Sequence, residues 1–154
     1  MTDDTQKFID DIVQKTLEFL GFPAARVTTQ SHLPNVWHSD IEVPEGAGAV
    51  IGERGQGLLA LEHMLRRMLS KNIGNTIRFS IDINGYRAEN ARLLRERARA
   101  AADEAKQHGA IVRFEPMTAF ERRIIHLELA ARGDIVTESN GEGLNRHVVV
   151  RPYP

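Results

Sequence analysis

The segment "AVIGERGQGLLALEHML", residues 49–65, decides the expected fold of the first part of the chain. A short apolar run leads into a Gly-x-x-Gly step, after which apolar residues recur at helical spacing. Because glycine has no Cβ atom, the backbone can approach a ligand closely here, and the N–H groups at the start of a helix attract anions. Arg54 can reach a phosphate, whereas Glu53 repels one. The segment therefore predicts either a phosphate-binding loop or a tight turn that only begins a helix.

The patterns on both sides of this loop predict an α+β protein of two small domains. The first domain, residues 1–84, is expected to have the element order αββααβ, with a helix at 5–20, strands at 25–30 and 36–43, a short helix before the loop, a helix at 56–71 and a strand at 76–83. The second domain, residues 85–154, is expected to have the order αβαββ, with a long helix at 87–108, a strand at 110–114, a helix at 118–131 and strands at 134–139 and 146–151.

Local sequence signals also predict where one helix begins and which helix faces are buried. Thr118 and Glu121 form a capping box that fixes the start of the helix at 118–131. The core side of that helix is expected to consist of Phe120, Ile124, Leu127 and Ala131. In the helix at 56–71, we expect Leu58, Leu61, Leu65 and Met68 to be buried and Glu62, Arg66 and Arg67 to face solvent.

The distribution of charge separates the two parts of the chain. The formal net charge is only −1, but residues 1–50 hold eight acids and three bases, whereas residues 51–154 hold thirteen acids and seventeen bases. Fifteen of those seventeen bases are arginine, which can contact phosphates in bidentate fashion and stack on bases. The alternative is an arginine-rich helix surface that is merely solvated.

Several classes of function are disfavoured by composition. The chain has no cysteine, which excludes a disulfide framework, a thiol nucleophile and a cysteine-type zinc site. The six histidines are dispersed without the spacing of a metal site, and no catalytic grouping can be proposed from spacing. We therefore expect no catalytic residues, no metal, no cofactor and no enzymatic activity. The sequence has neither a membrane-spanning apolar run nor a signal segment, so we expect a cytoplasmic protein without membrane insertion.

A second candidate site lies on the helix at 118–131, where Arg122 and His126 are four residues apart and share one face. Arg122 can pair with a phosphate or stack on a base. His126 can donate to a phosphate or stack, and it gains a positive charge below about pH 6.5 if its pKa is near the reference value. Arg146 and Arg151 flank the last strand and either extend this basic surface or are ordinary exposed charges. The alternative for the helix pair is a solvated arginine and a half-buried histidine.

The loop and the second motif together resemble known modules. A Gly-x-x-Gly loop between two helices in the order αββααβ resembles the type II KH domain, whose loop clamps about four backbone nucleotides beside an apolar groove for the bases. The whole chain resembles the Jag, or SpoIIIJ-associated (KhpB-like), family of bacterial RNA-binding proteins, which join a KH domain to an R-3-H domain. The matching stretches are "VIGERGQGLLALEHML" (50–65), "IDINGYRAEN" (81–90), "FEPMTAFERRIIHLEL" (114–129) and "TESNGEGLNRHVVVRP" (137–152).

This resemblance implies a ligand, a set of contacts and a cellular role. The ligand is single-stranded RNA or single-stranded DNA, bound by Arg122 and His126 and by a KH loop made of Ile51, Gly52, Glu53, Arg54 and Gly55. The role is post-transcriptional control linked to bacterial cell elongation and division, with a small single-KH protein or a second copy of the chain as partner. The chain is expected to be a short form without the family's N-terminal Jag domain. The competing hypothesis is a protein interaction scaffold whose KH unit dimerises and whose RNA affinity is marginal.

Overall fold

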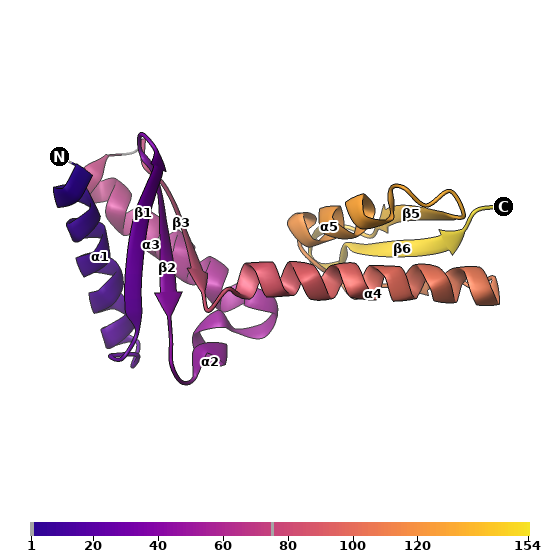
Figure 1. Cartoon of the computed structure of the whole chain (residues 1–154), viewed down its shortest axis with the longest axis horizontal. Helices are drawn as coiled ribbons and strands as arrows, with labels where there is room; N and C mark the ends of the chain where they lie inside the picture. Colours follow the sequence, from indigo (N-terminus) through magenta and orange to yellow (C-terminus); the bar gives the residue numbers. More distant parts are fainter. Residues whose placement is uncertain (1, 75) are drawn as a thin grey trace. The chain divides into compact units, whose positions relative to one another are not determined.

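The chain divides into two units, with the division between Arg87 and Ala88. The structure is a computed structural model that describes residues 2–74 and 76–154. Each unit combines helices with a three-stranded sheet, so the predicted α+β class is confirmed (Figure 1). Within the described residues, no helix is both long enough and apolar enough to cross a lipid bilayer.

The first unit has the predicted order αββααβ. Its elements are α1 (Thr2–Phe19), β1 (Arg26–Leu33), β2 (Val36–Glu42), α2 (Ala47–Ile51), α3 (Gln56–Ile73) and β3 (Arg78–Ile83), with a 3-10 turn η1 (Glu53–Gly55) between α2 and α3. The sheet order is β1-β2-β3, with β1 and β2 antiparallel and β2 and β3 parallel. The strand β3 therefore has β2 on one side only, and its other edge needs partners for its backbone groups.

The core of the first unit lies between the sheet and the helices α1 and α3, which pack side by side (Figure 1). The buried side chains from α1 are Ile9, Val13 and Leu17, at helical spacing. The strand alternation predicted from the sequence is confirmed, because Trp37 and Ile41 of β2 and Phe79, Ile81 and Ile83 of β3 are buried, as is Ile77 just before β3.

The prediction for the buried face of α3 is wrong at two positions. Met68 is 38% exposed and Leu69 is buried in its place, whereas Glu62, expected to face solvent, is only 9% exposed. The physical reason is the free edge of β3, which α3 packs beside. A polar side chain that faces this edge meets backbone N–H and C=O groups instead of water, so a carboxylate is retained in the interior.

The carboxylate of Glu62 binds two arginines and the backbone of β3. Its Oε1 accepts from Arg66 Nη2 at 2.6 Å, and its Oε2 accepts from Arg87 Nη2 at 2.6 Å and from the backbone N–H of Ile81 at 3.2 Å. The guanidinium of Arg66 donates to the carbonyl of Phe79 through Nε and Nη2, at 3.2 and 3.1 Å, and Arg87 Nε donates to the carbonyl of Ile81 at 3.1 Å. These side chains supply the partners that a further strand would otherwise provide.

The second unit has the predicted order αβαββ. Its elements are α4 (Tyr86–His108), whose first two residues belong to the first unit, β4 (Val112–Arg113), α5 (Ala119–Leu129), β5 (Ile135–Asn140), the 3-10 turn η2 (Gly143–Asn145) and β6 (His147–Pro152). The sheet order is β4-β6-β5 and both pairings are antiparallel. The strand expected at 110–114 is only two residues long in the structure.

Alanine dominates the side of α4 that packs into the core of the second unit. The buried residues of α4 are Ala91, Leu94, Ala98, Ala101, Ala102 and Ala105. They share a cluster with side chains from α5 and from the inner face of the sheet, including Ile125, Leu129, Val148 and Val150. Small side chains allow the helix to lie close to its neighbours, which explains why so alanine-rich a helix is retained.

The start of α5 is confirmed, but its predicted core face is wrong. Glu121 Oε2 accepts from the backbone N–H of Thr118 at 2.8 Å, and Thr118 Oγ1 accepts from the N–H of Glu121 at 3.3 Å, which is the predicted capping box. Of the four residues expected in the core, only Ile124 is buried; Phe120 and Leu127 are 64% and 66% exposed, and Ala131 is exposed beyond the helix end. The core side is formed by Ile124, Ile125 and Leu129.

We expect Glu62→Gln to lower the free energy of unfolding of the first unit by about 2 kcal/mol, because two guanidiniums and an amide lose a charged acceptor. The loss is smaller than for a fully buried pair, since the side chains of Arg66 and Arg87 are 42% and 38% exposed. Urea unfolding followed by fluorescence measures this, because Trp37 is the only tryptophan and lies in the first core.

The matched control is Asp11→Asn, which removes the exposed ion pair between Lys15 and Asp11 on α1. Its expected effect is about 0.5 kcal/mol or less. Equal losses in the two variants would contradict a special role for Glu62.

Candidate functional site

The Gly-x-x-Gly loop has a positive φ at three of its four positions. Gly52 has φ 72° and ψ 176°, Arg54 has φ 53° and ψ 29°, and Gly55 has φ 76°. A left-handed conformation is uncommon for a residue with a Cβ atom, so Arg54 is strained locally. The side chains of Glu53 and Arg54 are both exposed. The loop therefore presents one acid and one base to solvent on a backbone that is fixed by the flanking helices.

Close packing explains both glycines of the loop. A Cβ atom on Gly52 would lie 2.8 Å from the backbone nitrogen of Gly57, and a Cβ atom on Gly55 would lie 2.8 Å from Cε1 of the Tyr86 ring. Both distances are shorter than a carbon atom tolerates. The loop thus needs glycine to fold as well as to approach a ligand.

A third glycine, Gly57, belongs to the same arrangement and was missed by the sequence analysis. A Cβ atom at Gly57 would lie 2.4 Å from the carbonyl oxygen of Val50 at the end of α2. The helices α2 and α3 therefore meet backbone to backbone at this point. The signal in the sequence was the repeated glycine of "GQG" at residues 55–57, directly inside the first turn of a helix.

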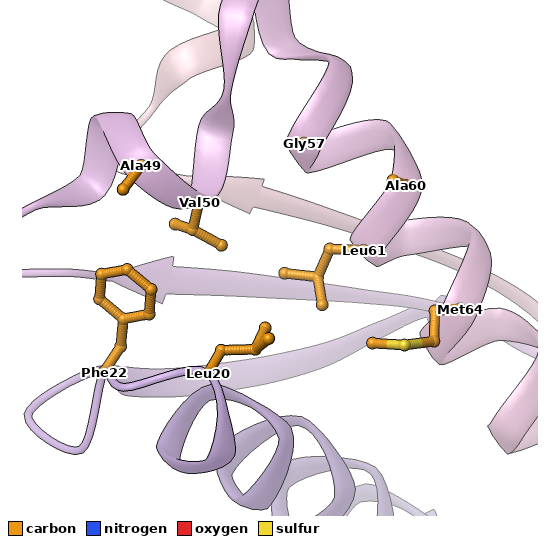
Figure 2. Close-up of a pocket in the computed structure, with 8 residues that line it drawn as sticks. All are labelled: Leu20, Phe22, Ala49, Val50, Gly57, Ala60, Leu61 and Met64. Atoms are coloured by element: carbon orange, nitrogen blue, oxygen red, sulfur yellow. The ribbon is translucent and has the colours of Figure 1, made fainter.

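An apolar groove of about 410 Å³ lies beside the loop (Figure 2). Figure 2 shows Leu20 and Phe22, which follow α1, on one side of the groove and Val50 and Leu61 on the other. The remaining lining residues are Ala49, Gly57, Ala60 and Met64. The lining carries no charged side chain, so the groove suits an apolar or planar group rather than a phosphate.

In the second unit, Met117 joins two of the predicted basic residues. Its carbonyl oxygen accepts from Arg122 Nη1 at 2.8 Å, and its backbone N–H donates to the carbonyl of Arg146 at 3.1 Å. The segment before α5 and the segment before β6 therefore lie side by side, which places the backbone of Arg146 next to the residue that holds the guanidinium of Arg122. The side chain of Arg146 is exposed.

The imidazole of His126 is held between two hydroxyl groups of β5. Its Nδ1 lies 2.8 Å from Thr137 Oγ1, and its Nε2 lies 2.8 Å from Ser139 Oγ. A neutral imidazole donates through one nitrogen and accepts through the other, and a hydroxyl can take either role. The half-buried ring thus connects α5 to β5 on the inner side of the sheet.

The condition under which His126 would be charged just below pH 6.5, a pKa near the usual value, is not met. Burial, and then the positive charge of Arg122, lower the pKa of His126 below its usual value of 6.5. The ring is therefore neutral at pH 7, and protonation would replace a ring acceptor with a second donor toward the hydroxyls.

The arginines of the second unit fall into two groups. Those of α4 are mostly neutralised within the protein, since Arg92 pairs with Glu89 and Glu96, and Arg95 and Arg99 pair with Glu128. Arg151 likewise pairs with Glu138 at 2.8 Å, on the sheet face opposite to Thr137 and Ser139, so it does not join Arg122. Within the described part of the second unit, the arginine side chains without a hydrogen bond, ion pair or ring contact are Arg113, Arg123 and Arg146.

Comparison with known proteins identifies the class of the second unit. Residues 92–152 match the family model of the R-3-H domain. The α+β unit that carries Arg122 and His126 is therefore an R-3-H domain.

The chain belongs to the KhpB, or Jag-like, family. Proteins named RNA-binding protein KhpB from Clostridium symbiosum and Bacillus subtilis are 36% and 37% identical to it over 103 and 108 residues, which cover 67% and 69% of this chain and 46% and 52% of the relatives. A protein of the same name from Lactiplantibacillus plantarum is 32% identical over 103 residues, which cover 67% of this chain and 32% of the relative. The chain spans about half the length of the first two relatives.

We expect the stability of the second unit to fall as the pH drops below 6.5, because unfolding releases His126 from a setting that disfavours its charge. With a folded pKa below the unfolded value, the contribution of His126 is complete above pH 6.5 and is lost as the pH falls toward the folded pKa. Urea unfolding at pH 7.5 and 5.5, followed by circular dichroism, should show a smaller pH dependence in His126→Gln than in the parent. The control variant replaces the exposed imidazole of His108, and the same pH dependence in parent and His126→Gln would refute this expectation.

We expect Gly57→Ala to lower the free energy of unfolding of the first unit by about 1 to 3 kcal/mol, because the added methyl group would push α2 away from α3. Gly48→Ala in α2 is the matched control, since a Cβ atom there meets nothing within 4 Å. That variant should be neutral or more stable by about 0.5 kcal/mol. Fluorescence-monitored urea unfolding compares the two, and equal midpoints would rule out the close contact.

Proposed function

We propose that this chain binds single-stranded RNA through both units and is not an enzyme, with residues 1–84 acting as a KH domain and residues 85–154 as an R-3-H domain. The names of its relatives and the R-3-H match support this function. The observation that carries the proposal is that Met117 links two arginine-bearing segments, since its carbonyl holds the guanidinium of Arg122 and its N–H binds the backbone carbonyl of Arg146. Two arginines carried by neighbouring segments suit the closely spaced phosphates of a nucleic acid.

In the KH unit, the loop from Ile51 to Gly55 lies against the sugar-phosphate backbone. Gly52 and Gly55 keep side chains out of the way, and Arg54 contacts a phosphate while Glu53 weakens the attraction. The apolar groove beside the loop accepts planar bases, because its lining offers dispersion contacts and no competing charge. The affinity of this unit for the sugar-phosphate backbone is therefore modest, and the second unit supplies additional phosphate contacts.

In the R-3-H unit, Arg122 and Arg146 contact phosphates and His126 is a positioning residue. Its neutral ring fixes α5 against β5 through Thr137 and Ser139, which sets the place of Arg122 one turn earlier on the same helix. Arg151 contributes less, because Glu138 already neutralises it. Single-stranded DNA offers the same phosphates, so a preference for RNA over DNA would have to come from contacts with the ribose 2′-hydroxyl groups.

The family resemblance supports a cytoplasmic role in post-transcriptional control linked to bacterial cell elongation and division. It also supports a small single-KH protein, or a second copy of the chain, as partner. The competing function is a protein scaffold with marginal RNA affinity, which the net charge of −1 and the exposed carboxylate of Glu53 favour.

Binding of a labelled 12-nucleotide single-stranded RNA, measured by fluorescence anisotropy at 50 and 200 mM salt, tests the proposal. Three phosphate contacts would weaken the affinity about 20-fold between these salt concentrations, because each contact adds about −0.7 to the slope on logarithmic axes. Arg122→Gln and Arg54→Asp should each bind more weakly, and Arg122→Gln should lower the slope by about 0.7. The matched control is Arg92→Gln, which removes an arginine that is already paired with two acids.

Each outcome bears on a different part of the proposal. A parent chain without salt-dependent binding would favour the scaffold. A parent that binds, with Arg122→Gln and Arg54→Asp variants that bind equally well, would keep the function and overturn the assigned residues. An equal loss in Arg92→Gln would reduce the assigned site to a general effect of net charge.

A further inference from the structure

The helix α5 has an exposed apolar face that its own domain does not use. We define the outer face of α5 by Phe120, Arg123 and Leu127, which are spaced by three and four residues and so lie in one row. Phe120 and Leu127 are 64% and 66% exposed, although Ile125 and Leu129 already bury the opposite side of the helix. Large apolar groups on an exposed surface mark a candidate binding site.

The charges around the outer face suit an anionic ligand. Arg123 lies between the two apolar side chains and has no hydrogen bond or ion pair within the part of the chain that the structure describes. The acids of α5 are engaged elsewhere, since Glu121 forms the capping box and also accepts from Asn90, and Glu128 pairs with Arg99. The outer face therefore combines an aromatic ring and an aliphatic side chain with an uncompensated positive charge.

Arg122, the proposed phosphate-binding residue of this helix, lies beside the outer face and about 100° around the helix axis from Arg123. It is adjacent to Arg123 in the sequence and its guanidinium is fixed to the carbonyl of Met117, just before the first turn of α5. A strand whose phosphates contact Arg123 would carry its bases past the ring of Phe120, because bases and phosphates alternate along the chain at the spacing of a few ångströms.

We infer that the outer face of α5 is a base-stacking surface for single-stranded RNA, on which the ring of Phe120 stacks against one nucleobase and Leu127 contacts the next nucleotide. This inference rests on the proposed RNA-binding function. It assigns to the R-3-H unit a contact with the bases in addition to phosphate contacts. Stacking on a phenylalanine depends little on base identity, so the surface adds affinity with little sequence preference.

The test compares two probes that carry the same phosphates, a 12-nucleotide single-stranded RNA and an abasic strand of equal length. Phe120→Leu, which keeps the apolar surface but loses the aromatic ring, should weaken binding of the RNA about tenfold and leave binding of the abasic strand unchanged. The slope of affinity against salt should not change, because no phosphate contact is lost. Phe120→Trp should retain the affinity, and the new indole should be quenched when RNA binds.

The matched control is Phe19→Leu, which removes another aromatic ring, 91% exposed at the end of α1. It should bind both probes like the parent. Because Phe120 is exposed, the unfolding midpoint of Phe120→Leu should equal that of the parent.

The outcomes separate this inference from the function on which it rests. A parent chain that does not bind RNA overturns both. A parent that binds with the expected salt dependence, together with a Phe120→Leu variant that binds RNA equally well, overturns the stacking surface alone and leaves the outer face as a site for protein docking. An equal loss on both probes would also overturn it, because the lost contact would then not involve a base.

Discussion

The arrangement of the first unit depends on one carboxylate. Glu62 accepts hydrogen bonds from two guanidiniums and from the backbone of β3, so it joins α3, the free edge of the sheet and the start of α4. Two neighbouring residues at the start of α4 make separate contacts with the first unit. The ring of Tyr86 packs on Gly55, and Arg87 binds Glu62. The conformation of the Gly-x-x-Gly loop and the closure of the sheet edge are thus fixed by the same turn of helix.

Local signals in the sequence were sufficient for the order of the elements and for the start of α5. Period-two alternation identified β3, and Thr118 with Glu121 identified a helix cap, because both features depend on residues close in sequence. The buried faces were harder to predict. Glu62 is interior because a strand edge with bare peptide groups lies opposite, and Phe120 is exterior because Ile125 and Leu129 already fill the core side. Polarity alone cannot show either, since both depend on contacts between distant segments.

In the candidate site too, local features were predictable from the sequence and contacts between distant segments were not. The motif positions Gly52, Gly55, Arg122 and His126 stand out in the sequence because their spacing is local. The structure adds contacts that spacing cannot predict. Met117 links the segment of Arg146 to Arg122, Arg151 is paired with Glu138, and His126 lies between two hydroxyls. The sequence did not predict a role for Gly57, because that role depends on a backbone contact with Val50 and not on any ligand.

The ion pairs along α4 have a consequence for selectivity. Its arginines contribute to the composition of the chain, but acids on the same helix and on α5 already compensate most of their charge. A polyanion near this helix experiences little net electrostatic attraction. The ion pairs therefore reduce the non-specific binding that an arginine-rich helix would otherwise cause. Internal compensation of this kind leaves the few unpaired guanidiniums as the places where an encounter can be prolonged.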